Sequence, residues 1–208
     1  RVLKGGQLHI GEQGEVLFRG PNVMAGYWNN EEATAAAIDS DGWLHTGDAG
    51  YVDVDGFLVI TDRIKDIIVT LGGKNVAPQP IEGLILADPL FEHAVLLGDN
   101  RPCVTLLVKP SLPHVEELGK LMQWPGEVAD WLKSNELAEE LRRRVTALTD
   151  KLPSQEKPRA TELMDGDLTT DNGLLTPTLK VRRRQVEERF KELIDGMYEA
   201  LERRRRSS

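Results

Sequence analysis

One charged segment organises this 208-residue chain, and it reads Asp62-Arg63-Ile64-Lys65-Asp66-Ile67-Ile68-Val69-Thr70-Leu71-Gly72-Gly73-Lys74-Asn75-Val76. Its first five residues carry four charges, a short apolar run follows, and a Gly-Gly turn then sends the chain back. The sequence before this segment predicts small strands and turns, whereas the sequence after it predicts a compact unit with helices. We therefore predict that this segment is a hinge between two structural units.

The composition is that of a globular protein, with 40% hydrophobic and 29% charged residues. The net charge of −8 argues against a nucleic-acid-binding surface. A single cysteine, Cys103, excludes an intrachain disulfide and fits a reducing compartment. Because no apolar run approaches the ~20 residues of a membrane span, we expect a cytoplasmic protein. Peripheral association with a membrane stays open, and the oligomeric state is not predicted.

The first third of the chain predicts a small β subdomain. Asp55-Gly56 separates two apolar runs, Tyr51 to Val54 and Phe57 to Ile60, which is typical of a β-hairpin. Glu15 to Arg19 is a further strand candidate, and the alanine-rich run 31–38 is a short helix candidate. Strands dominate this part of the predicted fold.

The remaining sequence predicts a second hairpin and a short mixed sheet packed with helices. The hairpin turns at Gly72-Gly73, and the segment Ala160 to Leu168 is strand or loop. The expected buried strands are Ala94 to Leu97 and Val104 to Val108. The expected helices are Ile81 to Ala87, Leu112 to Gln123, Glu127 to Lys133, a helix capped by Ser134, and a last helix through Val186, Phe190, Leu193, Ile194, Met197 and Leu201, with Arg203 to Arg206 as a frayed basic end. The fold class is therefore α+β.

Two candidate ligand-binding features precede the Gly-Gly turn. Asp48 follows Thr46-Gly47 at the end of a predicted strand, where a carboxylate can accept hydrogen bonds from vicinal hydroxyls such as those of ribose. A turn-forming aspartate is the commoner explanation of this tripeptide alone. The Arg63 guanidinium offers several hydrogen-bond donors in a fixed planar arrangement. In an extended strand, the side chain of Lys65 would lie on the same face as that of Arg63. A charged edge strand that resists aggregation explains this pair equally well.

Two further candidates lie at and beyond that turn. Gly72 and Gly73 allow a ligand or a backbone to approach closely, although a plain hairpin turn would also use them. Their spacing is not that of a phosphate-binding P-loop. Lys180 follows Pro177 on a stiffened loop, which could place it as a point charge against a phosphate or carboxylate. Most lysines ahead of an amphipathic helix are only solvated.

No metal site is predicted, because the four histidines lack the spacing of metal ligands. Cys103, in an apolar strand candidate, is expected to be an inert core thiol.

These features occur in the order seen in the acyl-adenylate-forming enzymes, which include acyl-CoA synthetases, luciferases and adenylation domains. The segment Leu175 to Lys180 reads Leu-Thr-Pro-Thr-Leu-Lys and resembles the form found in long-chain fatty acyl-CoA synthetases, and the long insert from Pro110 to Lys157 points the same way. Three segments closely resemble the family's C-terminal motifs: Gly20-Pro21-Asn22-Val23-Met24-Ala25-Gly26-Tyr27-Trp28, Gly42-Trp43-Leu44-His45-Thr46-Gly47-Asp48 and Asp62-Arg63-Ile64-Lys65-Asp66-Ile67-Ile68.

The resemblance implies a role for each candidate residue. Residues 1–62 would be the end of the N-terminal AMP-binding domain, and residues 63–208 a mobile C-terminal domain. The implied roles are ribose binding for Asp48 and Arg63, the hinge for Lys65, the pantetheine channel for Gly72 and Gly73, and contact with the α-phosphate and the acyl carboxylate for Lys180.

The function implied is that of an AMP-forming long-chain fatty acid–CoA ligase, with fatty acid, ATP and CoA as substrates and Mg²⁺ accompanying ATP in the full-length enzyme. The family's phosphate loop and its Tyr-Gly-x-Thr-Glu motif are absent from this sequence, which also starts without a methionine or a signal peptide. We therefore expect a fragment that lacks the rest of its N-terminal domain and is inactive alone. Two alternatives stay open: an acyl-AMP ligase that loads a carrier protein, and a docking module without chemistry.

Overall fold

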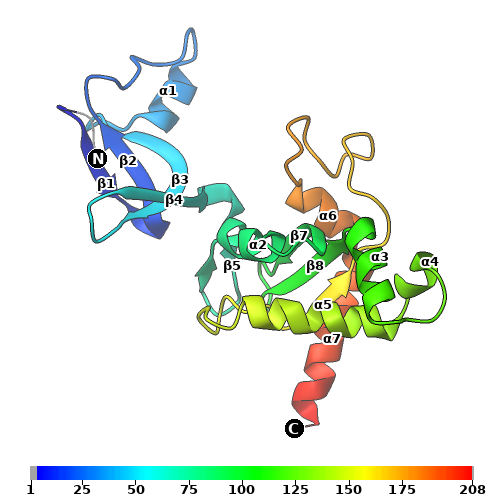
Figure 1. Cartoon of the computed structure of the whole chain (residues 1–208). Helices are drawn as coiled ribbons and strands as arrows, with labels where there is room; N and C mark the ends of the chain where they lie inside the picture. The colour runs from blue at the N-terminus through cyan, green and yellow to red at the C-terminus, as the bar shows by residue number, and fades with distance from the viewer. Residues whose placement is uncertain (1–3, 208) are drawn as a thin grey trace. The chain divides into compact units, whose positions relative to one another are not determined.

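The computed structural model describes residues 4–207, and they form two compact units that divide between Ile67 and Ile68. This division falls inside the charged segment (Figure 1). The predicted functional boundary after Asp62 stays a prediction.

The first unit is built on a four-stranded antiparallel sheet in the order β1-β2-β3-β4. The hairpin between β3 and β4 turns where predicted, because the Asp53 carboxylate accepts the backbone N–H of Asp55 at 3.0 Å and of Phe57 at 2.8 Å. The elements of this unit are β1 (Gln7–Ile10), η1 (Glu12–Gly14), β2 (Glu15–Arg19), α1 (Glu31–Ala37), β3 (Leu44–Val52), β4 (Leu58–Arg63) and η2 (Ile64–Asp66).

Two expectations for this unit need correction. Asp48 lies in the interior of β3, not at the end of a strand, because residues 44–52 form one continuous strand across Gly47 and Gly50. The register of β3 on β4 shifts between Ala49 and Gly50, as it does at a β-bulge. Strand β1 was not predicted: its residues Gln7 to Ile10 alternate polar and apolar side chains, but a run of four is a weak strand signal without the pairing to β2 that the structure shows.

The second unit combines a small hairpin with a three-stranded mixed sheet. In that sheet β7 (Phe91–Leu97) pairs antiparallel with β8 (Thr105–Pro110), and β8 pairs parallel with β9 (Thr161–Leu163). The other elements are β5 (Ile68–Val69), β6 (Asn75–Val76), α2 (Pro78–Leu86), α3 (Leu112–Leu121), α4 (Val128–Trp131), α5 (Asn135–Leu148), α6 (Arg183–Arg189) and α7 (Lys191–Arg206). The predicted α+β class and mixed sheet are confirmed.

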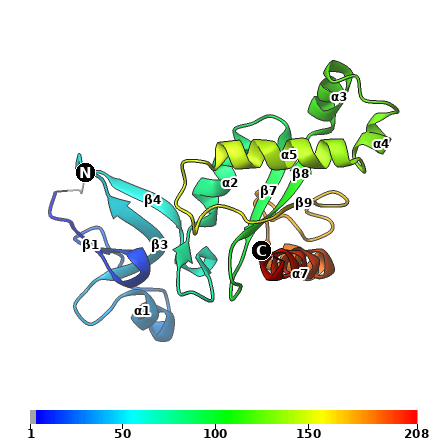
Figure 2. The ribbon, with the colours of Figure 1, turned by 90° about the horizontal axis from the view of Figure 1, so that it is seen from below.

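Both faces of the mixed sheet are buried, because successive side chains on a strand point to opposite faces. Leu96 and Leu106 pack into the core that includes residues of α2, α3 and α5. Val95 and Leu107 pack into a second core with residues of α6 and α7. Figure 2 shows the sheet between α5 and α7. This sandwich fixes the end of β7 within the second unit.

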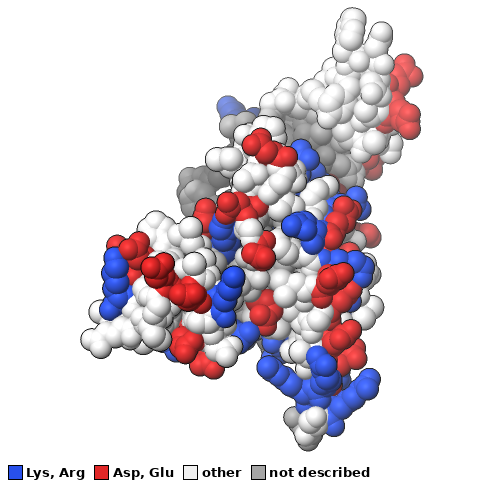
Figure 3. All heavy atoms as spheres, turned by 90° about the vertical axis from the view of Figure 1, so that its right-hand side faces the viewer, with Lys and Arg blue, Asp and Glu red and all other residues white. Residues whose placement is uncertain are grey.

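The last helix differs from its prediction in two respects. It divides at Phe190, whose φ of −106° and ψ of 21° are not helical, into α6 and α7. The run Arg203 to Arg206 is helical, not frayed, and Figure 3 shows Lys and Arg side chains gathered at this end of α7. Basic side chains at a helix C-terminus interact favourably with the helix dipole, which explains the extra turn.

Other predicted elements hold with small changes. Ser134 caps α5 as predicted, accepting the backbone N–H of Leu137 at 3.2 Å. Cys103 lies in a bend ahead of β8, not in a strand, and is half-buried. Burial raises the pKa of its thiol, although the nearby charge of Arg159 opposes this shift.

Within residues 4–207, no helix combines the length and the apolar character needed to span a membrane.

Candidate functional site

Asp48 and Arg63 form an ion pair across two neighbouring strands of the first unit. They are directly opposed in the pairing of β3 with β4, and Arg63 Nη1 donates to Asp48 Oδ1 at 2.7 Å. The Asp48 side chain is 32% exposed and that of Arg63 is 50% exposed. The pair is therefore pre-formed and accessible, as a site for the hydroxyls of a ribose requires.

The backbone beside Asp48 explains the Thr-Gly-Asp tripeptide. Thr46 Oγ1 donates to the carbonyl of Val16 at 2.7 Å and accepts the N–H of Asp48 at 3.1 Å. Gly47 has φ of +67°, and a Cβ at this position would lie 3.2 Å from Arg63 Nη2. The positive φ favours a glycine here, and a Cβ would also crowd the end of the Arg63 side chain.

Lys65 is the middle residue of η2, the last element before the division between the units. Its side chain is exposed. This position is compatible with a hinge, and the role of Lys65 stays a prediction.

Gly72 and Gly73 lie in the tight turn of the β5–β6 hairpin. Gly73 N donates to the carbonyl of Thr70 at 2.8 Å, and Thr70 N donates to the carbonyl of Lys74 at 3.0 Å. Gly73 has φ of +69°, and a Cβ built there meets no atom within 4 Å. The turn therefore presents bare backbone to open space, where a ligand can approach closely.

A cavity of about 670 Å³ borders this turn within the second unit. Gly72 and Lys74 line it from the hairpin, and Arg159 and Arg205 line it from other segments. Its lining includes one carboxylate, that of Glu202, which also faces Arg206 at 3.7 Å. Three cations against one carboxylate make this cavity positively charged in a protein whose net charge is −8. Such a cavity suits an anionic ligand.

Lys180 projects from a compact loop that Thr176 closes. Lys180 N donates to Thr176 Oγ1 at 3.0 Å, and Thr176 N donates to the carbonyl of Lys180 at 2.8 Å. Leu179 between them has φ of +61°, an uncommon conformation for a leucine. The Lys180 side chain is exposed. Sequence reasoning missed Thr176, although a hydroxyl residue directly before a proline in a turn was an available signal.

The structure brings some of the predicted residues together and leaves others apart. Asp48 contacts Arg63, and Gly72 and Gly73 share one turn. The loop before α6 and the β5–β6 hairpin lie at separate places in the second unit (Figure 1). Among residues 4–207, no group of three or more His, Cys, Asp or Glu side chains is arranged to hold a metal ion.

The first unit carries an exposed Asp–Arg pair, and the second unit carries a glycine hairpin and a lysine loop beside a helix-covered mixed sheet. This order of features resembles that of the C-terminal portion of an adenylate-forming enzyme. Residues 65–202 match the family described as the AMP-binding enzyme C-terminal domain, so the chain belongs to the AMP-binding enzymes.

Curated relatives include long-chain-fatty-acid–CoA ligases. The chain is 41% identical over 201 residues to FadD15 of Mycobacterium tuberculosis, a match that covers 95% of this chain and 33% of that protein. It is 34% identical over 209 residues to ACSBG1 of Homo sapiens, covering 89% of this chain and 28% of that protein. The chain thus spans about a third of the length of these relatives.

Solved structures agree with this assignment. The adenylation domain of the carboxylic acid reductase from Segniliparus rugosus, in complex with AMP and a co-purified carboxylic acid, matches with a TM-score of 0.70 at 25% identity, over 90% of this chain and 28% of that one. O-succinylbenzoate Coenzyme A synthetase from Bacillus subtilis, in complex with AMP, matches with a TM-score of 0.60 at 25% identity, over 89% of this chain and 34% of that one.

Proposed function

We propose that this chain is the C-terminal part of an AMP-forming long-chain fatty acid–CoA ligase. The observation that carries the proposal is the 41% identity to a long-chain-fatty-acid–CoA ligase across 95% of the chain. In the reaction, a fatty carboxylate first displaces pyrophosphate from ATP to give an acyl-adenylate. The thiol of CoA then displaces AMP to give acyl-CoA. The 208-residue chain by itself is not expected to perform either step.

In the first half-reaction, Asp48 and Arg63 bind the ribose of ATP, and Lys180 contacts the α-phosphate and the incoming carboxylate. The exposed 2.7 Å pair of Asp48 and Arg63 supports the first role. The closed Thr176–Lys180 loop supports the second, because it orders the backbone that carries the cation. A fixed positive charge stabilises the charge that develops during transfer at phosphorus. Among residues 4–207 no cluster of three or more potential metal-ligating side chains is present, and no step is assigned to magnesium.

In the second half-reaction, the Gly72-Gly73 turn borders the channel through which the pantetheine thiol arrives. The open space around Gly73 supports this role. The positively charged cavity beside Gly72 supports CoA as the acceptor, because CoA carries several phosphates. Residues 63–208 form one mobile domain that serves both half-reactions. Between the two half-reactions this domain rotates about Lys65 relative to residues 1–62. A charged segment at the division between the two units supports this hinge.

The test is a product assay on a full-length protein that contains this chain, supplied with ATP, palmitate and either CoA or a phosphopantetheinylated carrier protein. The proposal expects AMP, pyrophosphate and palmitoyl-CoA. Adenylate with thioester only on the carrier protein would favour the acyl-AMP ligase. Absence of any adenylate would favour the docking module and overturn the proposal.

A further inference from the structure

The end of strand β7 carries two sets of interactions that the proposed function has not yet used. One set surrounds Leu96, the last residue but one of the strand, and reaches the start of α6. The other surrounds the turn that follows Leu97 and reaches the β5–β6 hairpin. Each set therefore links the same strand to one of the two loops that carry the proposed chemistry.

At Leu96, Arg183 and Glu82 form a largely buried node. Arg183 Nη1 donates to Glu82 Oε1 at 2.6 Å and to the carbonyl of Leu96 at 2.6 Å. Glu82 Oε1 also accepts the N–H of Leu96 at 2.7 Å. The Arg183 and Glu82 side chains are 20% and 15% exposed. The node fixes the first residue of α6, and Lys180 stands three residues before it.

The second set of interactions lies just after β7, where the turn that follows Leu97 forms hydrogen bonds with β5 of the β5–β6 hairpin. Asp99 Oδ1 accepts the N–H of Val69 at 3.0 Å, and Asn100 N donates to the carbonyl of Val69 at 2.9 Å. The N–H of Leu71 donates to the carbonyl of Arg101 at 2.9 Å. Strands of two residues do not hold a hairpin in place by themselves. These three hydrogen bonds therefore position the Gly72-Gly73 turn.

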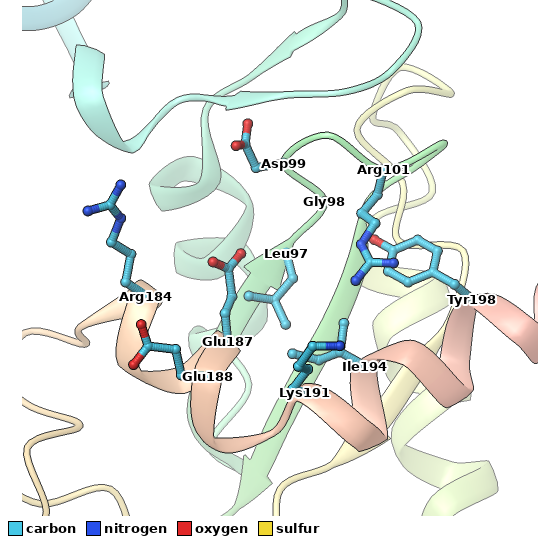
Figure 4. Close-up of a pocket in the computed structure, with 10 residues that line it drawn as sticks. All are labelled: Leu97, Gly98, Asp99, Arg101, Arg184, Glu187, Glu188, Lys191, Ile194 and Tyr198. Carbon is cyan, nitrogen blue, oxygen red and sulfur yellow. The ribbon is translucent and has the colours of Figure 1, made fainter.

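The turn after Leu97, which includes Asp99 and Arg101, is itself fixed to α7 at a cavity of about 480 Å³ (Figure 4). Arg101 Nη2 donates to Asp195 Oδ1 at 2.6 Å, and its guanidinium lies 4.9 Å from the centroid of the Tyr198 ring. The Tyr198 hydroxyl donates to the carbonyl of Cys103 at 2.9 Å. Burial raises the pKa of Tyr198 to about 12, so this hydroxyl stays a donor at neutral pH.

We infer that the end of β7 positions the two loops separately. Arg183 and Glu82 position the Lys180 loop for adenylate formation, and Asp99 positions the Gly72-Gly73 turn for thioester formation. All three are positioning residues, since each acts through another part of the chain. The inference rests on the proposed function, which assigns the two loops to different half-reactions.

The kinetic test compares Arg183→Met and Asp99→Ala in a full-length protein that contains this chain, with each half-reaction measured alone. Arg183→Met should slow acyl-adenylate formation by about tenfold or more and change thioester formation from supplied acyl-adenylate by less than about twofold. Asp99→Ala should show the opposite pattern. Asp99→Asn should restore the wild-type rate, because its amide oxygen can still accept the N–H of Val69. Glu82→Gln keeps an acceptor for Leu96 and provides a milder test of the Arg183 node.

A structural readout on the 208-residue chain separates this inference from the proposed function. Asp99→Ala should speed amide hydrogen exchange at Val69 and Leu71 and leave Lys180 unchanged, whereas Arg183→Met should do the reverse. Equal losses in both half-reactions for either variant, or exchange that changes in both loops together, would overturn the inference. A wild-type protein that performs neither half-reaction would instead overturn the proposed function.

Discussion

At the scale of single residues, Gly73 shows how backbone conformation and access to a ligand combine. Replacing Gly73 by leucine places a side chain at φ of +69°, where L-residues are strained by roughly 1–2 kcal/mol, and fills the open space beside the turn. In a full-length protein, Gly73→Leu should slow CoA-dependent release of AMP by about tenfold and leave acyl-adenylate formation nearly intact.

The matched control is Gly166→Leu. Gly166 has φ of +90° and also meets no atom within 4 Å of a built Cβ, but it lies outside the hairpin. It should carry similar backbone strain without an effect on AMP release. Unchanged thioester kinetics in Gly73→Leu would remove this turn from the channel.

Glu140 makes stability depend on pH through one carboxylate. A hydrogen bond from Arg143 is the largest cause that lowers its pKa to about 2, and Arg144 adds a second such bond. Because the pKa in the folded state lies below its value of 4.5 in the unfolded chain, the stabilisation is complete above about pH 4.5 and is lost as pH falls toward 2. Since Arg143 is exposed to solvent, screening by water keeps this contribution to the free energy of unfolding small.

The measurement is urea unfolding of the wild type and of Glu140→Gln at pH values from about 2, the pKa of Glu140 in the folded state, to about 7. The difference in unfolding free energy should be largest at neutral pH and vanish near pH 2. A difference that stays constant, or that grows as the pH falls, would show that the ion pairs do not stabilise the fold.

At the scale of elements, two glycines in helices predict opposite effects of one substitution. A Cβ at Gly119 in α3 would lie 2.3 Å from Trp131 Cζ3, so Gly119→Ala should destabilise the chain by about 1–3 kcal/mol through overpacking against α4. A Cβ at Gly83 in α2 meets nothing within 4 Å, so Gly83→Ala should stabilise it by about 0.5–1 kcal/mol. Thermal unfolding of both variants checks this, and equal signs would contradict the packing.

The element η2 carries the proposed hinge. Proline fixes φ near −65°, so Lys65→Pro in a full-length protein should restrict rotation, lowering thioester formation by about tenfold or more and sparing adenylate formation. Lys65→Ala is the control, because it removes the charge and keeps the backbone free. If Lys65→Pro lowered both half-reactions equally, Lys65 would not be the pivot.

Elements with a local signal were predictable, and those that depend on tertiary structure were not. The Asp55-Gly56 turn and the Ser134 cap form through nearby side chains, and both were predicted. The break at Phe190 and the continuity of β3 through Gly47 depend on packing and on strand pairing. The Asp99 and Arg183 contacts join residues 30 and 101 positions apart, which periodicity cannot show.

At the scale of the whole molecule, motif order predicted the family although no single motif did. The Thr-Gly-Asp tripeptide, the Gly-Gly turn and the lone lysine each have ordinary structural explanations. Their order along one chain resembles the adenylate-forming enzymes, and the match over residues 65–202 confirms that assignment. The opposed pair of Asp48 and Arg63 required the structure, because the register of β3 on β4 sets it.

The central claim is that one mobile domain uses Lys180 in the first half-reaction and withdraws it in the second. The most direct measurement takes Lys180→Ala in a full-length protein and follows acyl-adenylate formation and thioester formation from supplied acyl-adenylate separately. The account predicts a loss of about 10²–10³-fold in the first rate, the size expected for one transition-state donor, and a near-normal second rate. Equal losses in both rates, or no change in either, would contradict it.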